Sequence, residues 1–298
     1  MQCYLIEGGR RLEGKLAVHG AKNSALPILA AALMTGHSVI HNCPRLSDVE
    51  AACNILRYLG CSTMREGNSI AVDYTGGGDY RIPDALMREM RSSIVFLGAV
   101  IGRYGRAVVS MPGGCELGPR PIDMHLSSLR RLGVEIKEEH GLLDCRVPGK
   151  LTGAKITLPF PSVGATENVM LASCLAEGRT EIHNAAREPE IADLADFLCR
   201  CGAQIAIAPD GTVCIDGVEQ LHGCEHHVIP DRIAAATYLC CAAITGGRIE
   251  LTHTRPDHME AVLPVFEEAG CALTVEGNVI RLAAPARLNR IKSVRTMP

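Results

Sequence analysis

Residues 38–74 read SVIHNCPRLSDVEAACNILRYLGCSTMREGNSIAVDY and alternate strand and helix patterns. The apolar run SVIHN is typical of a short strand, and DVEAACNILRYL repeats its apolar residues at helical spacing. Gly60 ends that helix, because glycine is common just past the last helical residue. The remainder, CSTMREGNSIAVDY, contains two alternating runs around a turn, which predicts a pair of strands. The stretch therefore predicts the order strand, helix, strand, strand.

The helix end of this stretch recurs along the chain. Its copies end at Gly60 (LRYLGC), Gly133 (LRRLGV), Gly202 (LCRCGA) and Gly270 (FEEAGC), with spacings of 73, 69 and 68 residues. A strand and an apolar helix precede each copy, so the repeated unit reads βαβαββ. We expect KLAVH, RIP, KITLP and HVIP to be the opening strands, at residues 15–19, 81–83, 155–159 and 227–230. Three full units then occupy residues 15–226, a fourth fills 227–298, and the fold class is α/β.

The composition is that of a soluble globular protein. Of the 298 residues, 47% are apolar and 21% charged, which argues against disorder and suggests about two domains. The net charge of -3 argues against general nucleic-acid binding. We expect neither a secretory signal nor a membrane span, because MQCYLIEGGRRLEG lacks an apolar core and no apolar run is long enough. The 14 scattered cysteines favour reduced thiols, and the predicted location is the cytosol.

Residues 112–124, PGGCELGPRPIDM, are the strongest candidate for chemistry. Glycines on both sides of Cys115 free the backbone, and prolines stiffen the exit. Arg120 offers a planar fork suited to phosphate or carboxylate, and a cation beside a thiol lowers the pKa of that thiol. Other cysteines stand in apolar helical runs and read as small core residues, whereas Cys115 does not. The residues alone leave open whether Cys115 is reactive or structural.

Two further cations have both a functional and a structural interpretation. Lys22 follows a strand and precedes a helix, which fits an anion site at the helix start or a surface turn capped by Asn23 or Ser24. Arg91 either binds a ligand or decorates the polar face of a helix. The sequence around Lys22 and Arg91 is compatible with both interpretations of each residue.

Two other patterns are interpreted structurally. Asp231 mirrors Asp84 and is first of all a repeated helix-start signal. His222, Cys224 and His226 would share one face of a strand, as the ligands of a metal do. We expect no metal there, because no second ligand pair follows at a usual zinc spacing.

Three motifs together resemble one known family. GAKNSALPIL at residues 20–29, the loop around Cys115 and SVGATENVMLA from Ser162 are similar to those of UDP-N-acetylglucosamine 1-carboxyvinyltransferases, the enolpyruvyl transferases of peptidoglycan synthesis. REPEI from Arg187 and PDRI from Pro230 fit the same family. The resemblance covers the whole chain.

The resemblance implies an inside-out α/β barrel of two domains, each with three βαβαββ units around a pseudo-threefold axis. It places the first domain at residues 22–227 and a partial second domain at residues 1–21 plus 228–298, because the first residues of the family pair with its later units. Two units have no counterpart here, nor have the family's acid/base aspartate and the arginine that grips the pyruvyl carboxylate. We therefore expect an incomplete second domain. The chain is then a fragment, the product of a truncated open reading frame, or a chain completed by self-association or by a partner chain.

The roles of the family carry over to the matched positions. The resemblance implies that the charge of Lys22 holds phosphoenolpyruvate and that Asn23 contacts it or the sugar. Arg120 would bind the phosphate as it leaves, and Cys115 would donate a proton to the methylene carbon. The nucleotide sugar would contact Arg91, Arg120, Pro121, Ile122, Asp123, Met124, Phe160, Pro161, Ser162, Val163 and Gly164, with Asp123 near the uracil ring.

The implied reaction adds the sugar 3-hydroxyl to the central carbon of phosphoenolpyruvate and then eliminates phosphate, with no metal and no cofactor. Protonating an enol ether carbon needs a positioned acid, and expelling phosphate needs fixed cations in a dry site. The resemblance further implies roles in cell wall biogenesis, cell shape, the cell cycle and cell division. It also implies inhibition by fosfomycin through alkylation of Cys115.

Three alternatives stay open. The sister enzymes acting on shikimate 3-phosphate share the fold, but GAKN and the GGC loop favour the nucleotide sugar. A noncatalytic paralogue, which binds UDP-N-acetylglucosamine or regulates a full-length enzyme, fits the absent aspartate and arginine. A chain that does not fold properly alone would follow from uncovered apolar faces.

Overall fold

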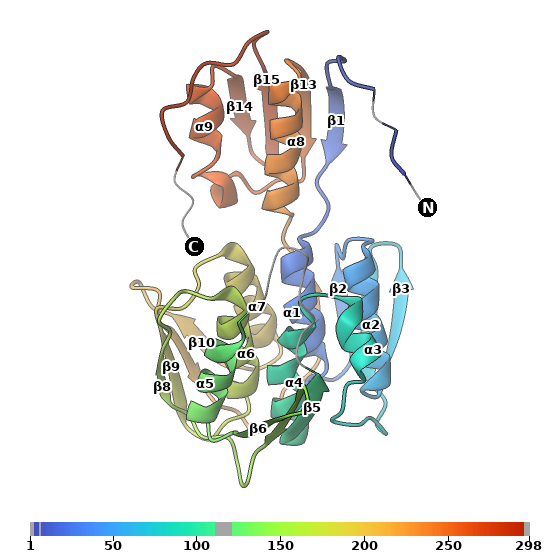
Figure 1. Cartoon of the computed structure of the whole chain (residues 1–298), viewed down its shortest axis with the longest axis vertical. Coiled ribbons are helices and arrows are strands. Elements are labelled where there is room, and N and C mark those ends of the chain that lie inside the picture. The colour runs from blue at the N-terminus through green and yellow to red at the C-terminus, as the bar shows by residue number, and fades with distance from the viewer. Residues whose placement is uncertain (1–2, 6, 111–120, 295–298) are drawn as a thin grey trace. The chain divides into compact units, whose positions relative to one another are not determined.

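The computed structural model describes residues 3–5, 7–110 and 121–294, and the chain divides into two compact units. The larger unit consists of Lys22–Val228. The smaller unit joins the residues before Lys22 to the segment that starts at Ile229 (Figure 1). Among the described residues, every helix is too short or too polar to cross a membrane.

The larger unit contains three successive repeats. The first has α1 (Lys22–Ala32), β2 (Ser38–His41), α2 (Ser47–Tyr58), β3 (Cys61–Glu66) and β4 (Ser69–Tyr74). The second has α3 (Asp84–Glu89), the 3-10 helix η1 (Ser93–Val95), α4 (Phe96–Tyr104), β5 (Arg106–Ser110), α5 (Asp123–Arg131), β6 (Glu135–Glu139) and β7 (Leu142–Arg146). The third has β8 (Lys155–Thr157), α6 (Val163–Ser173), β9 (Arg179–His183), α7 (Pro189–Arg200), β10 (Gln204–Ile207) and β11 (Val213–Asp216), and β12 (Glu225–His227) follows it.

Each repeat places its strands in one sheet with the same order. In the third repeat the order is β8-β9-β11-β10, where β8 runs parallel to β9 and the other neighbours are antiparallel. The first repeat has the equivalent order β12-β2-β4-β3. In the second repeat the order is β5-β7-β6, and the predicted strand RIP is reduced to one parallel bridge between Arg81 and Val108. The strand stops there because Pro83 leads directly into α3.

The opening strands of the first and fourth repeats are exchanged. β1 (Glu13–Ala17) runs parallel to β13 (Arg248–Thr252) in the smaller unit. β12 runs parallel to β2, with His226 opposite Ile40. The expectation that KLAVH opens the first unit and HVIP the fourth is therefore wrong, whereas the pairing of the first residues with a later unit, implied by the resemblance, is confirmed. Parallel strands are joined by long crossovers, so neighbourhood in sequence does not choose the partner.

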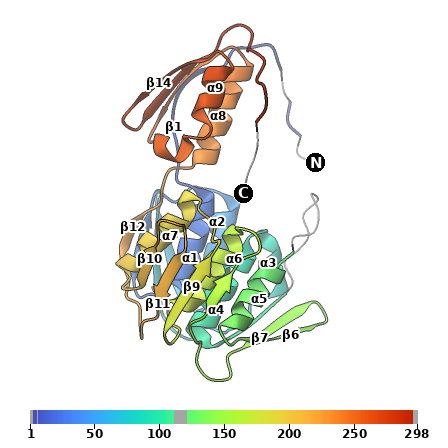
Figure 2. The ribbon, with the colours of Figure 1, turned by 90° about the vertical axis from the view of Figure 1, so that its left-hand side faces the viewer.

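The first long helix of each repeat lies in the interior of the larger unit. Nearly the whole of α1, the first two thirds of α4 and almost all of α6 are buried, and the sheets lie around these helices (Figures 1 and 2). α4 and α6 approach closely at Gly98, where an added Cβ would lie 2.3 Å from the carbonyl oxygen of Asn168. Only glycine permits that approach. Helices inside and sheets outside are the arrangement expected of an inside-out α/β barrel.

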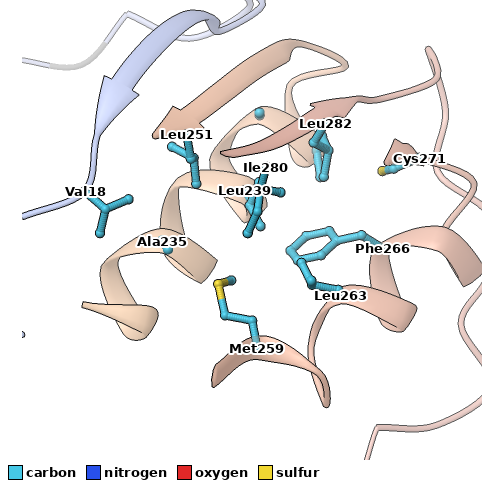
Figure 3. Packing of buried hydrophobic residues seen from close by; sticks show 12 residues of the cluster. Val18, Ala235, Leu239, Leu251, Met259, Leu263, Phe266, Cys271, Ile280 and Leu282 are labelled. Carbon is cyan, nitrogen blue, oxygen red and sulfur yellow. The ribbon is translucent and has the colours of Figure 1, made fainter. Parts of the chain in front are cut away.

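The smaller unit repeats the same sheet order once. Its elements are β1, α8 (Arg232–Ile244), β13, the 3-10 helix η2 (Pro256–Met259), α9 (Leu263–Glu268), β14 (Ala272–Glu276) and β15 (Val279–Ala283), with strand order β1-β13-β15-β14. Leu239 of α8 packs with Leu251, Phe266 and Ile280 in its core (Figure 3). The predicted helix start at Asp231 is confirmed, because its carboxylate accepts hydrogen bonds from the backbone N–H groups of the first turn of α8.

Candidate active site

A cavity of about 540 Å³ opens in the larger unit where several helices begin. Its walls come from the first turns of α1, α2, α5 and α6 and from the segment around η1. Helix amino termini carry partial positive charge, so this space favours an anionic ligand. The lining residues are Lys22, Asn23, Leu26, Pro27, Asp48, Arg91, Ser92, Ile94, Val95, Pro121, Ile122, His125, Ser162, Val163, Gly164 and Glu167.

Lys22 and Asn23 line the cavity from the first turn of α1. The Nζ of Lys22 donates to Oδ2 of Asp48, at the start of α2, over 2.9 Å. The alternative of a turn capped by Asn23 or Ser24 is wrong, because both residues lie inside the helix and the hydroxyl of Ser24 donates to Asp193. The structure thus directs a cation and an amide side chain to the cavity.

Arg91 reaches the cavity from outside any helix. α3 ends at Glu89, and η1 begins at Ser93, so the alternative that Arg91 decorates a helix face is wrong. Arg91 is exposed, and no carboxylate among the described residues forms an ion pair with it. Its guanidinium is therefore available to an anion.

The start of α6 forms another wall. Ser162 caps the helix, and its Oγ accepts from the backbone N–H of Ala165 over 3.3 Å. Val163 and Gly164 follow in the first turn, where backbone N–H groups have no partner within the helix. Together with the cations of Lys22 and Arg91, which line the same cavity, these amides suit phosphate oxygens.

His125 and Glu167 are buried titratable groups in the wall of the cavity. Burial lowers the pKa of His125 to about 4, and the nearby Asp123 offsets that only in part. Burial also raises the pKa of Glu167 to about 8, with Glu190 and Glu188 adding to the rise. Both side chains are therefore mostly uncharged at neutral pH.

The structure brings together some of the predicted site residues. Eight of them line the cavity: Lys22, Asn23, Arg91, Pro121, Ile122, Ser162, Val163 and Gly164. Asp123 and Met124 lie in the first turn of α5 outside the cavity wall, and Phe160 and Pro161 precede the cap of α6, also outside it. Cys115 and Arg120 lie outside the described residues.

Four polar residues of the wall were not anticipated from the sequence. They are Asp48, Ser92, His125 and Glu167. Asp48 stands in a helix-start pattern, and the other three stand in or beside helical runs that read as ordinary faces. Only the fold shows that these positions turn toward one cavity. The one hint in the sequence was the negative charge of Asp48, which could pair with a lysine of the site. Lys22, the lysine that it contacts, lies 26 residues away in the chain.

The alternating His222, Cys224 and His226 do not gather around a metal position. Within the described ranges, no group of three or more His, Cys, Asp or Glu side chains is arranged to hold a metal ion. His226 instead donates from Nε2 to Oδ1 of Asp193 over 3.0 Å, and Cys224 lies 3.4 Å from the sulfur of Cys201. These side chains connect β12 to α7.

Comparison with known proteins finds similarity to carboxyvinyltransferases. Residues 6–298 match the model of a family described as EPSP synthase (3-phosphoshikimate 1-carboxyvinyltransferase). The chain is 48% identical over its whole length to UDP-N-acetylglucosamine 1-carboxyvinyltransferase 2 of Caldanaerobacter subterraneus subsp. tengcongensis, of which it spans 72%. It is 44% identical, again over its whole length, to UDP-N-acetylglucosamine 1-carboxyvinyltransferase of Acinetobacter baylyi, of which it also spans 72%.

Solved structures share the fold. The enolpyruvyl transferase NikO from Streptomyces tendae superposes with a TM-score of 0.83 at 23% identity, over 94% of this chain and 67% of its own. EPSP synthase from Acinetobacter baumannii superposes with a TM-score of 0.71 at 22% identity, over 98% of this chain and 68% of its own. The predicted α/β fold of the enolpyruvyl transferase type is confirmed.

Proposed function

This chain belongs to the enolpyruvyl transferase family, and from that premise we propose that it is a UDP-N-acetylglucosamine 1-carboxyvinyltransferase. It transfers the enolpyruvyl group of phosphoenolpyruvate to the 3-hydroxyl of UDP-N-acetylglucosamine and releases phosphate. The observation that carries this proposal is the cavity in which Lys22, Asn23, Arg91 and the start of α6 face one space. Relatives of that name are 44 to 48% identical over the whole chain, which favours the nucleotide sugar over shikimate 3-phosphate.

The two substrates are assigned to different residues of the cavity wall. Lys22 and Asn23 hold phosphoenolpyruvate, because an ammonium and an amide at a helix start suit a phosphate or carboxylate. Arg91, the residues from Pro121 to Met124 and those from Phe160 to Gly164 hold the nucleotide sugar. Asp48 orients Lys22 through the 2.9 Å ion pair. Arg120 also binds the phosphate group of phosphoenolpyruvate as it leaves.

The reaction proceeds by addition and elimination. Cys115 gives a proton to the methylene carbon of phosphoenolpyruvate, while the sugar 3-hydroxyl bonds through its oxygen to the central carbon and gives its own proton to solvent. Cations then stabilise the phosphate, which leaves with the electron pair of its bond to the central carbon. The methyl group returns a proton to the Cys115 thiolate, which restores the carbon double bond and the thiol. Fixed charges act most strongly where water is excluded, so the apolar lining residues Leu26, Pro27 and Val95 strengthen the electrostatic stabilisation.

The cellular role follows from this reaction. The reaction is the first committed step of peptidoglycan synthesis, and we place it in the cytosol. The enzyme then supports cell shape, the cell cycle and cell division. Fosfomycin, an epoxide, would alkylate Cys115. No described residue favours the alternative of a noncatalytic UDP-N-acetylglucosamine-binding paralogue.

Self-association is part of the proposal. α8 exposes Ile233 by 50% and Ile244 by 80%, whereas the corresponding helices α1, α4 and α6 of the larger unit are mostly buried. A second copy would cover this face of α8. Ile244→Glu should lower the mass measured by light scattering to that of one chain, while Ile207→Glu, at a 46% exposed position on β10, should not. A monomeric unaltered chain would contradict self-association.

The central experiment measures phosphate release from phosphoenolpyruvate with and without UDP-N-acetylglucosamine. The expected result is release that depends on the sugar nucleotide and is abolished by Cys115→Ala. Replacing the sugar nucleotide by shikimate 3-phosphate should give no release. A folded chain that binds UDP-N-acetylglucosamine without releasing phosphate would favour the noncatalytic alternative, and release with shikimate 3-phosphate alone would favour the sister reaction.

A further inference from the structure

Two cysteine sulfurs face each other in the larger unit. Cys201 follows the last residue of α7, Cys224 directly precedes β12, and the Sγ of Cys201 donates to the Sγ of Cys224 over 3.4 Å. Among the described cysteines, no other two sulfurs are in hydrogen-bond contact. The two residues are 23 positions apart in the chain, so tertiary structure brings them together.

Backbone hydrogen bonds hold both cysteines in place. The carbonyl oxygen of Cys201 accepts from the backbone N–H of His222 over 2.9 Å, which keeps the segment before β12 beside the end of α7. The carbonyl oxygen of Cys224 accepts from the backbone N–H of Val39 in β2, also over 2.9 Å. Because a disulfide bond is about 2.05 Å long, the two side chains have to bring their sulfurs roughly 1.4 Å closer than the present 3.4 Å. The thiols are thus held within reach of such a bond.

The two thiols differ in their access to solvent. Cys201 is fully buried, whereas Cys224 is half-buried. Burial raises the pKa of both thiols, but for Cys224 the hydrogen bond from Cys201 and the charge of Arg200 offset part of that rise. The thiolate is the form that attacks a disulfide. Cys224 is therefore the thiol that a reagent in solution reaches first, and Cys201 is placed to react second.

We propose that Cys201 and Cys224 form a redox-reversible disulfide site, which is oxidised by a small-molecule disulfide of the glutathione type. The thiolate of Cys224 attacks one sulfur of the reagent, the disulfide bond of the reagent breaks, and one glutathione leaves as a thiolate that takes up the proton lost by Cys224. Cys201 then loses its proton and attacks the sulfur of Cys224, which expels the second glutathione thiolate, and this thiolate takes up the proton of Cys201. The two protein thiols lose two electrons, and the reagent is reduced to two thiols. This inference does not depend on the proposed function.

The bond would connect the end of α7 to the start of β12. In a reducing compartment the two thiols stay separate, and they become joined as the ratio of glutathione disulfide to glutathione rises. The disulfide closes a loop between residues 201 and 224 and so restricts the unfolded chain. The oxidised chain should therefore be more stable than the reduced chain.

Peptide mapping tests the site directly. The full chain is incubated with glutathione disulfide and glutathione at several ratios, and the unreduced digest should contain peptides joined through Cys201 and Cys224. Treatment with dithiothreitol should separate them. Cys199→Ser is the matched control, because it removes an exposed thiol two residues before Cys201 and should leave the bond unchanged. A folded chain without this link, or a link that is lost in Cys199→Ser, would overturn the proposal.

Two single variants test the order of the two steps. Cys201→Ser keeps the accessible thiol but lacks the second one, so Cys224 should retain one glutathione as a mixed disulfide. Cys224→Ser leaves only the buried thiol, so Cys201 should carry no glutathione. The reverse pattern, or no adduct on Cys224 in a folded Cys201→Ser chain, would overturn the assigned order. The peptide map of the unaltered chain tests the pair even where a variant does not fold.

Thermal unfolding tests whether the folded structure accommodates the bond. The melting temperature of the oxidised chain should exceed that of the reduced chain by about 5 °C, as for a disulfide that closes a loop of this length. The same oxidising treatment should not raise the melting temperature of Cys224→Ser. A mapped bond with an unchanged or lower melting temperature would overturn the inference that the native positions of the two thiols suit a disulfide.

Discussion

The ammonium of Lys22 lies 2.9 Å from a carboxylate oxygen of Asp48, and both side chains line the same cavity. The two residues come from the first turns of α1 and α2, so their contact fixes one helix start against the other. The side chains are 38% and 26% exposed, and such pairs contribute at most about 1 kcal/mol to stability. The contact therefore contributes more to the orientation of the Lys22 side chain than to the stability of the fold.

The first prediction concerns this orienting contact. Asp48→Ala should lower kcat/KM for phosphoenolpyruvate about tenfold, because one charge-assisted hydrogen bond no longer holds the ammonium. The melting temperature should change little. Glu50→Ala is the matched control, since Glu50 forms a 3.0 Å ion pair with Arg57 on the exposed side of the same helix. Equal kinetic losses in the two variants would contradict the role of Asp48.

A second prediction concerns the close approach of α4 and α6. Gly98→Ala would place its Cβ 2.3 Å from the carbonyl oxygen of Asn168, so the helices must separate. We expect a loss of about 3 kcal/mol in the free energy of unfolding, as for other overpacked cores. Gly149→Ala is the control, because a Cβ there meets nothing within 4 Å. Chemical denaturation measures both, and a Gly98→Ala protein as stable as the control would show that the helices do not pack this closely.

The third prediction concerns Glu167 and pH. The buried carboxyl has its pKa raised to about 8, whereas an unfolded glutamate titrates near about 4.3. Between these values the folded chain holds the extra proton, so this group makes stability fall as pH rises. Glu167→Gln should remove that fall, so its free energy of unfolding should exceed that of the unaltered chain by on the order of 5 kcal/mol at pH 8, with little difference near pH 4.

Denaturation at several pH values checks the behaviour of Glu167. Glu139→Gln, at an exposed position at the end of β6, provides the comparison for loss of a charge alone. A difference between Glu167→Gln and the unaltered chain that is the same at pH 4 and pH 8 would show that the carboxyl of Glu167 does not titrate in this window.

A fourth prediction concerns selective alkylation. Incubation with fosfomycin and UDP-N-acetylglucosamine should add the mass of one fosfomycin, at Cys115. Burial raises the pKa of Cys43, Cys145 and Cys174 to about 12, which keeps these thiols protonated and unreactive. Peptide mapping locates the adduct, and Cys115→Ala should stay unmodified. An adduct on the exposed Cys199 or Cys240 would show that accessibility alone governs the reaction.

The repeated architecture could be predicted from the sequence, because helix periodicity, terminating glycines and strand pairs are local properties. The glycines at positions 60, 133, 202 and 270 all adopt the positive φ expected after a helix. The pairing of β1 with β13 and of β12 with β2 could not be predicted from these patterns. A parallel edge strand forms its hydrogen bonds with a strand that is distant in sequence. In both pairs here the partners are more than 180 residues apart.

The candidate site divides in the same way. Lys22, Arg91 and the start of α6 could be named in advance, because their motifs resemble a family and because cations and helix starts suit anions. Asp48, His125 and Glu167 stand in ordinary helical patterns, and their properties come from burial and from partners distant in the chain. The 2.9 Å hydrogen bond between Asn168 and His125 and the proton retained by Glu167 are consequences of packing and low polarity. Local sequence thus specified the elements and the motif chemistry, while tertiary packing set the strand exchange and the protonation of the site.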